Sequence, residues 1–167
     1  KVDDTEFLLK FWNDRQNVML VGETQAGKTM LVSVLAVLAA KAAGFKKPLP
    51  VFTLSGSKGV SEFDLFGQPT AFTDANGVEH VVWLPGVVDL AVRAGGILYL
   101  DEANAMDEDT TSALHSVCDH RRFFVNRMKA VQSVHDGVTT FMPEVVQGNA
   151  RPQDTVARLG GDEFVVI

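Results

Sequence analysis

Residues 22–29 constrain the fold of this chain more than any other segment. They read Gly22-Glu23-Thr24-Gln25-Ala26-Gly27-Lys28-Thr29 and match the phosphate-binding pattern G-x-x-x-x-G-K-[ST]. A short apolar run, Asn17–Val21, precedes the pattern, and a Leu/Val/Ala-rich segment without Pro or Gly, Met30–Ala43, follows it. This order predicts a buried strand, a glycine-containing loop and a helix, which is the structural context that a phosphate-binding loop (P-loop) requires.

The loop predicts a particular chemistry. Backbone N–H groups at the start of a helix point toward anionic phosphate oxygens, and the helix dipole favours negative charge there. We expect Lys28 to reach the β- and γ-phosphates and the Thr29 hydroxyl to bind Mg²⁺. The predicted nucleotide-binding residues are Gly22, Glu23, Thr24, Gln25, Ala26, Gly27, Lys28, Thr29 and Met30.

Composition limits the remaining possibilities. With 167 residues, 46% of them hydrophobic and 22% charged, the chain suits one globular domain. A net charge of −6 argues against a nucleic-acid-binding surface across the domain. The single cysteine, Cys118, has apolar neighbours and predicts a buried thiol in a reducing compartment. The apolar stretch Met30–Ala43 is too short to span a membrane. We therefore expect a cytoplasmic protein without a membrane partner. The charge does not indicate a nucleic-acid partner, although it leaves a local basic groove open.

Helices and strands alternate along the rest of the chain. Besides the helix after the P-loop, helices are predicted at 6–13, 61–67, 87–93 and 108–120. Gly67 closes the second of these, Gly95 stops the third, and Asp107 is the N-cap of the fourth. Strands are predicted at 51–54, 97–100 and Asp162–Ile167. This alternation predicts an α/β fold, a three-layer sandwich around a mostly parallel sheet.

Two further segments predict antiparallel pairs. Residues 70–73 and 79–83 flank Asn76-Gly77, which is typical of a β-hairpin turn. Its His80 and Trp83 are expected to be exposed, where they contact a substrate or neighbour or else pack on their own domain. Residues 126–158 are the least readable; they predict a strand pair around Asp136-Gly137 and otherwise loop.

A second half of a nucleotide site follows the strand at 97–100. Four apolar residues lead directly into Asp101-Glu102, the Walker B pattern. Ligands of parallel sheets bind beyond the carboxyl ends of strands, so this pair is expected to meet the P-loop in space. Asp101 would hold Mg²⁺ beside Thr29, and Glu102 would orient the water that attacks the γ-phosphate. The alternative is an ordinary exposed strand end.

Together these residues resemble an AAA+ ATPase, and most closely the branch with a hairpin inserted before Walker B, which includes MoxR-like, midasin/dynein-like and McrB-like proteins. Three features carry the resemblance. Asp64-Leu65-Phe66-Gly67 is similar to the branch's "DLxG", and the hairpin 70–83 stands where the branch has its helix-2 insert. The run Gly95–Asn104 is similar to "GGILxLDExN". The resemblance extends from Asn17 to about Phe124.

The resemblance implies ATP hydrolysis coupled to the remodelling of a protein or other macromolecule, usually within a homo-oligomeric ring, often a hexamer. It implies ATP and Mg²⁺ as cofactors and places Asn104 near the γ-phosphate. The predicted catalytic residues are then Lys28, Glu102 and Asn104, although Asn104 could equally cap the next helix. The base preference, ATP or GTP, stays open because the loop contacts only phosphates.

On the layout of this family, residues 1–167 would be one nucleotide-binding domain that ends before sensor 1. The arginine finger and sensor 2 would follow later in a longer polypeptide. This expectation leaves a second candidate function open, a non-hydrolysing, nucleotide-gated binding or scaffold module.

The last fourteen residues also resemble another family. Residues 158–164, Arg-Leu-Gly-Gly-Asp-Glu-Phe, are similar to the GGDEF motif of diguanylate cyclases. That resemblance implies synthesis of a cyclic dinucleotide from GTP. A tight turn that enters a strand is the alternative, and the sequence favours it because no other cyclase-like segment lies upstream.

Overall fold

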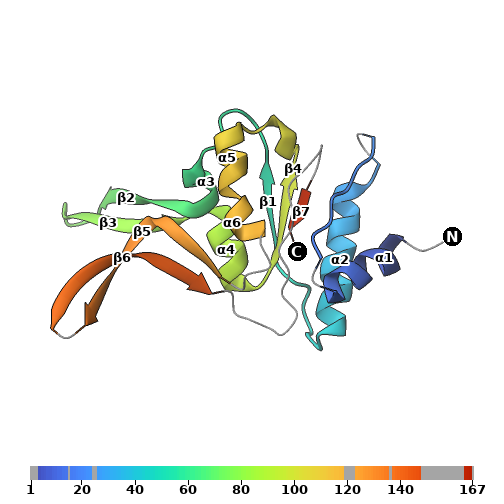
Figure 1. Ribbon diagram of the computed structural model, residues 1–167, viewed down its shortest axis with the longest axis horizontal. Coiled ribbons are helices and arrows are strands. Elements are labelled where there is room, and N and C mark those ends of the chain that lie inside the picture. The colour runs from blue at the N-terminus through green and yellow to red at the C-terminus, as the bar shows by residue number, and fades with distance from the viewer. Residues whose placement is uncertain are drawn as a thin grey trace.

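The computed structural model describes residues 4–14, 16–23, 26–118, 123–135, 137–147 and 164–166. A central sheet lies between helices, and two long hairpins project from one side of it (Figure 1). The helical segments are α1 (Asp4–Asn13), α2 (Lys28–Ala42), α3 (Glu62–Phe66), α4 (Val87–Ala94), the 3-10 turn η1 (Ala103–Ala105), α5 (Glu108–Ala113) and α6 (His115–Cys118). The strands are β1 (Val51–Ser55), β2 (Gly67–Thr73), β3 (Glu79–Pro85), β4 (Ile97–Asp101), β5 (Phe123–His135), β6 (Val138–Gln147) and β7 (Phe164–Val166).

The central sheet has the strand order β1-β4-β7. β1 and β4 run parallel, with Ser55 opposite Asp101, whereas β7 runs antiparallel to β4, with Phe164 opposite Leu100. The prediction of a mostly parallel sheet is therefore confirmed for the β1–β4 pair and wrong for β7. Parallel pairing requires a crossover that returns the chain to the same end of the sheet. Residues 56–96, with α3, the first hairpin and α4, supply it between β1 and β4, whereas the strands described ahead of β7 form another hairpin.

The predicted strand at 17–21 is also absent from this sheet. Its backbone is extended, and only Val18 forms an isolated bridge. Val18 and Leu20 pack against the core, but Met19 and Val21 are 40% and 69% exposed. One apolar side is thus enough to hold the segment against the domain, but it does not create a strand ladder.

β4 organises the core because its side chains alternate between two apolar clusters. Ile97 and Tyr99 belong to a cluster with α1 and α2, whereas Leu98 and Leu100 belong to one with α3, α4 and α6. All four side chains are 2% exposed or less. Helices therefore cover both faces of the sheet (Figure 1), as the three-layer prediction required.

The predicted helices form with small differences. α2 begins two residues early, at Lys28, and Gly67 closes α3 as expected. The helix predicted at 108–120 breaks at the buried Leu114 into α5 and α6. Asp107 does stand at the N-cap position of α5, but its side chain makes no capping bond; its carbonyl oxygen instead accepts a hydrogen bond from the Thr111 N–H at 2.9 Å.

Both predicted antiparallel pairs are confirmed as hairpins. In the β2–β3 turn, Asp74 Oδ1 accepts hydrogen bonds from the N–H groups of Asn76 and Val78, both at 2.9 Å. Gly77 adopts φ 80°, which the Asn-Gly pattern predicts. The β5–β6 hairpin turns at Gly137, with φ 77°, and its register shifts between Asn126 and Ala130.

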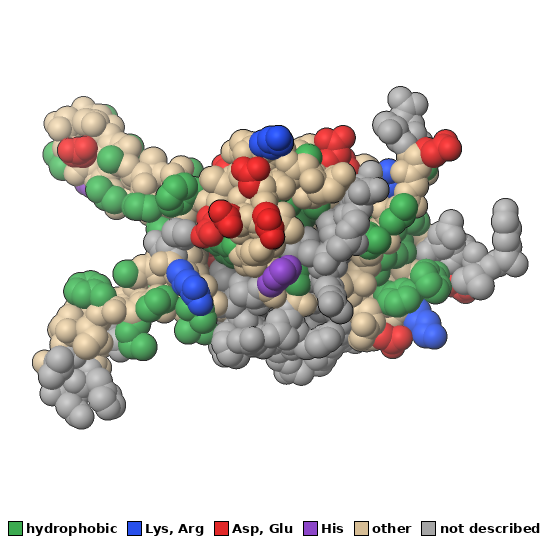
Figure 2. All heavy atoms as spheres, turned by 45° about the horizontal axis from the view of Figure 1, so that its top comes forward, with side chains coloured by type: hydrophobic (Ala, Val, Ile, Leu, Met, Phe, Trp, Pro, Cys, Tyr) green, Lys and Arg blue, Asp and Glu red, His purple; other side chains and the backbone are tan. Residues whose placement is uncertain are grey.

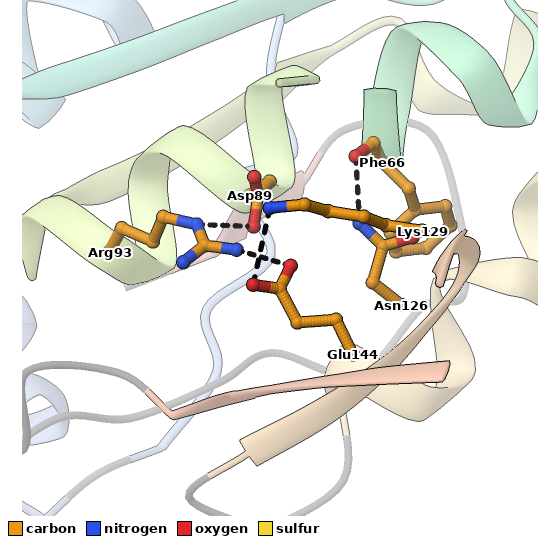
Figure 3. Close-up of polar contacts among 6 residues, drawn as sticks. All are labelled: Phe66, Asp89, Arg93, Asn126, Lys129 and Glu144. Carbon is orange, nitrogen blue, oxygen red and sulfur yellow. Dashed lines mark hydrogen bonds and ion pairs between the residues drawn. The ribbon is translucent and has the colours of Figure 1, made fainter. Parts of the chain in front are cut away.

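A polar network holds the second hairpin against the helical layer (Figure 3). Arg93 of α4 bridges Asp89, at 2.8 Å, and Glu144 of β6, at 2.6 Å. Lys129 of β5 pairs with the same Glu144 at 3.2 Å. The fully buried Asn126 donates a hydrogen bond to the Phe66 carbonyl oxygen at 3.0 Å. Side chains of α4, β5 and β6, together with the Phe66 carbonyl group of α3, thus fix the base of this hairpin.

Candidate functional site

The P-loop and α2 position the predicted phosphate-binding residues. Gly27 is the N-cap of α2 with φ 85°, a left-handed conformation that favours glycine. The half-buried Lys28 begins the helix, and its Nζ donates hydrogen bonds to the carbonyl oxygens of Gly22, at 2.7 Å, and Glu23, at 3.3 Å. The Lys28 ammonium group therefore contacts the backbone at the start of the loop.

The neighbouring residues of the loop lie at the surface. Thr29 is exposed, and Met30 is 73% exposed, so the first turn of α2 is open to a ligand. Ala26 is exposed as well, while Thr24 and Gln25 lie outside the described residues. Exposed N–H groups at the start of a 15-residue helix are the physical requirement for anion binding.

The acidic residues lie where β4 ends. Asp101 is the last residue of the strand and is half-buried, whereas Glu102 is exposed. Glu102 adopts φ 51° and ψ 39°, and its carbonyl oxygen accepts a hydrogen bond from the Ala105 N–H at 2.8 Å. Asn104 is exposed on the same 3-10 turn. Because Asp107, and not Asn104, stands at the N-cap of α5, the capping alternative for Asn104 is wrong.

Gly56 also belongs to this end of the sheet, although it is not among the residues predicted for the site. Its N–H donates a hydrogen bond to the Asp101 carbonyl oxygen at 2.7 Å, and a Cβ at this position would lie 2.2 Å from the Glu102 carbonyl oxygen. The available signal was its position, because this glycine directly follows a strand that pairs with the Walker B strand. Its pairing partner, however, becomes known only from the sheet register.

The fold brings the two predicted halves to one side of the molecule. The loop that precedes α2 and the carboxyl end of β4 both lie at the top of Figure 1. Val32 and Leu35 of α2 belong to the same buried cluster as Ile97 and Tyr99 of β4, so the two elements share one packed core. In Figure 2, acidic side chains gather in the middle of the face that contains this edge.

The oxygen atoms that Thr29 and Asp101 offer are of the kind that binds Mg²⁺. Thr29 offers a hydroxyl oxygen and Asp101 a carboxylate, and Mg²⁺ prefers such oxygen ligands. No group of three or more His, Cys, Asp or Glu side chains suited to a metal occurs within the described ranges.

Other candidate groups are accounted for structurally. Burial raises the pKa of the Cys118 thiol to about 12, so the predicted buried thiol is confirmed and is no nucleophile. His80 is exposed as predicted and pairs with Asp74 at 3.0 Å. The pKa of Asp74 is lowered, mostly by the hydrogen bond from the Val78 N–H and to a smaller extent by the hydrogen bond with His80. Trp83 was expected to be exposed but is half-buried, with the Lys129 ammonium 5.8 Å from its ring centre.

Two observations concern the wider chain. Within the described part of the chain, none of the helices has the length and apolar character needed to cross a membrane. The cyclase-like residues 158–163 lie outside the described residues, and Phe164–Val166 form β7.

Comparison with known proteins identifies the family. The sequence profile of the AAA domain of the dynein-related subfamily matches residues 17–158. An uncharacterized protein of Staphylococcus aureus (strain bovine RF122 / ET3-1) is 32% identical over 111 residues, which cover 66% of this chain and 39% of that protein. An uncharacterized protein of Staphylococcus haemolyticus (strain JCSC1435) is 31% identical over 115 residues, 69% of this chain and 41% of its own length.

The chain spans about two fifths of the length of these curated relatives. The profile match, in contrast, covers most of the chain and includes both the P-loop and the acidic end of β4. The chain belongs to the dynein-related subfamily of AAA domains, a family whose members are generally ATPases.

Proposed function

We propose that this domain binds and hydrolyses ATP and couples turnover to the remodelling of a protein or other macromolecular partner. One observation carries the proposal. Lys28 begins α2, Asp101 ends β4 and Glu102 follows it, and these two elements share one buried cluster in a member of the AAA family. This arrangement supports a phosphate-binding half and a water-activating half of a single site.

The proposed reaction assigns each residue one task. Lys28 and the N–H groups at the start of α2 stabilise charge on the phosphate oxygens. Glu102 accepts a proton from water, whose oxygen then attacks the γ-phosphorus. The bond between the γ-phosphorus and its bridging oxygen breaks, and the electron pair of this bond stays on the ADP oxygen. ADP and inorganic phosphate are then released. Mg²⁺, held by Thr29 and Asp101, would neutralise phosphate charge.

Asn104 completes the proposed catalytic set. It follows Glu102 by two residues and is exposed on the η1 turn, at the same end of the sheet. An amide side chain there is suited to a hydrogen bond with the attacking water or a γ-phosphate oxygen. We assign it a supporting role behind Lys28 and Glu102.

The finer proposals concern assembly and location. We propose a MoxR-like member that works in a homo-oligomeric ring in the cytoplasm. AAA domains commonly form oligomeric rings, and this supports the proposed ring. Exposed apolar side chains on both hairpins (Figure 2) support contact with a partner, and they include Phe72, Val81, Leu84 and Phe141.

Two substitutions test the proposed function. Lys28→Ala should abolish binding of Mg-ATP, and Glu102→Gln should bind it normally but release phosphate only at a small residual rate. Lys58→Ala and Glu108→Gln are matched controls, because both residues are exposed and lie outside the site. Titration calorimetry measures binding, and a phosphate-release assay measures turnover, with GTP as a parallel substrate. Normal hydrolysis by Glu102→Gln would show that its assigned role is wrong.

The second candidate function is a nucleotide-gated binding module that does not hydrolyse ATP. The exposed apolar hairpins favour it, because they offer partner surface independent of turnover. The assays above separate the two functions if they are run both on this chain and on the full-length polypeptide. Binding without phosphate release in both would favour the module.

A further inference from the structure

The backbone of Glu102 is unusual within this molecule. Among the described residues it is the non-glycine residue with positive φ, at 51°. Residues with a Cβ rarely adopt this left-handed conformation unless their surroundings enforce it. The direction of the Glu102 side chain therefore depends on the contacts that fix its backbone.

Contacts on the downstream side hold one part of this backbone. The Ala105 N–H donates a hydrogen bond to the Glu102 carbonyl oxygen at 2.8 Å, and the Met106 N–H donates one to the Ala103 carbonyl oxygen at 3.2 Å. Ala103 itself is 1% exposed within the core cluster. These contacts close the 3-10 turn that follows Glu102.

Gly56 holds the other side. Its N–H donates a hydrogen bond to the Asp101 carbonyl oxygen at 2.7 Å. A Cβ on Gly56 would lie 2.2 Å from the carbonyl oxygen of Glu102, 2.8 Å from its carbonyl carbon and 3.1 Å from Ala103 Cα. All three are backbone atoms, so no flexible side chain could move aside. The φ of Gly56 is not positive, so its need for glycine comes from this close approach alone.

We propose that Gly56 is a positioning residue for catalysis, whose close approach fixes the left-handed backbone of Glu102 and thereby the direction of its carboxylate. This inference rests on the proposed hydrolytic role of Glu102. In the proposed mechanism, Gly56 contacts neither the nucleotide nor the attacking water. Any side chain at position 56 displaces the Glu102 carbonyl group and turns the carboxylate away from the attacking water.

Gly56→Ala tests the proposal, with Gly59→Ala as its matched control. Gly59 lies in the same loop, its φ is also not positive, and its added Cβ would meet only Ser57 Oγ, at 3.8 Å. In the full-length protein, Gly56→Ala should lower kcat by about tenfold to hundredfold, the effect of a small displacement in a catalytic group. The Kd for Mg-ATP should stay within about twofold. Gly59→Ala should change neither quantity.

A second pair of variants separates positioning from a general structural defect. Because Gly56 acts through Glu102, Gly56→Ala should cause no further loss of turnover in a Glu102→Gln background. A kcat that Gly56→Ala leaves unchanged in the folded protein would overturn the proposal. An equal fold-loss in both backgrounds would overturn it as well.

One measurement needs neither a substitution nor hydrolysis. The three-bond HN–Hα coupling and Cα chemical shift of Glu102 report its φ in solution. They should indicate a left-handed residue in the wild type and a changed conformation in Gly56→Ala. An ordinary helical or extended value in the wild type would overturn the inference even if Gly56→Ala fails to fold. A left-handed value without any ATP turnover would instead contradict the proposed function and leave the positioning contact standing.

Discussion

The two halves of the candidate site are built in contrasting ways. The acidic half ends β4, whose residues 97–100 are all 2% exposed or less and pack against a cluster on each face. The phosphate half follows an extended segment that packs through one side only. In that segment Val21 is 69% exposed, and beyond the loop Met30 is 73% exposed.

This difference has a consequence for function. The core fixes the acidic residues before any ligand arrives, whereas the loop depends largely on its own contacts, such as the Lys28 hydrogen bonds to Gly22 and Glu23. Phosphate oxygens would add hydrogen-bond acceptors for the N–H groups at the start of α2. We therefore expect nucleotide to order the phosphate half and to leave the acidic half unchanged.

The largest expected effect comes from removing the same side chain in each half. Leu100→Ala should lower the free energy of unfolding by about 2–5 kcal/mol, because it leaves a cavity in a fully buried cluster. Leu20→Ala removes a half-buried side chain and should cost about 1 kcal/mol. Urea unfolding followed by circular dichroism measures both. Equal losses would show that the phosphate half is as firmly packed as β4.

The same contrast explains what the sequence could predict. The run at 97–100 is apolar at every position, and such a run predicts a central strand whichever face its partners occupy. The Asn-Gly turn predicts the β2–β3 hairpin from local backbone chemistry alone. Both predictions are confirmed, because each depends on residues that are close in sequence.

The predictions that failed depended on distant partners. Residues 17–21 have strand-like composition, but within the described residues they form only the isolated bridge at Val18 and no strand ladder. The direction of β7 depends on the path of the chain before it, which short-range patterns do not encode. Gly56 was missed for the same reason, because its contact with Glu102 arises only once β1 and β4 are in register.

A second prediction measures the ordering of the loop by nucleotide. Mg-ATP at a hundred times its Kd should stabilise the protein by about 2.7 kcal/mol, and Lys28→Ala should remove this gain. Hydrogen exchange should slow at residues 17–23 and 26–31 and stay unchanged at 97–100. Lys58→Ala should retain the full stabilisation. Protection that rises equally in both segments would contradict the contrast between the two halves.

A third prediction concerns the strain stored in the acidic half. Glu102→Gly should raise the free energy of unfolding by up to about 1 kcal/mol, because glycine relieves the left-handed backbone but adds freedom to the unfolded chain. Glu108→Gly, in the first turn of α5, should instead lower it by up to about 1 kcal/mol. Thermal unfolding of the two variants compares them directly. A loss of stability in both would indicate that Glu102 is unstrained.

The smallest effect should come from Asp89 on α4. This helix belongs to the same apolar cluster as Leu98 and Leu100 of β4. Burial raises the pKa of its carboxyl group above the ordinary value of 3.8, although Arg93 opposes the shift. One reason is local, because the buried Asp89 Oδ2 has no hydrogen-bond partner in the described structure. Ionisation is therefore more favourable in the unfolded chain, and the stability contributed by Asp89 is full below 3.8 and lost as pH rises through the raised value.

Asp89→Asn should thus raise stability at neutral pH by less than about 1 kcal/mol, because asparagine stays neutral and its oxygen still accepts the bond from Arg93 Nε. This advantage should fade as pH falls toward 3.8. Asp109→Asn, at an exposed position of α5, should show no such trend. Chemical unfolding across this pH range provides the measurement. A stability loss that grows with pH would mean that the Arg93 ion pair outweighs burial, and that the acidic half is held by charge as much as by packing.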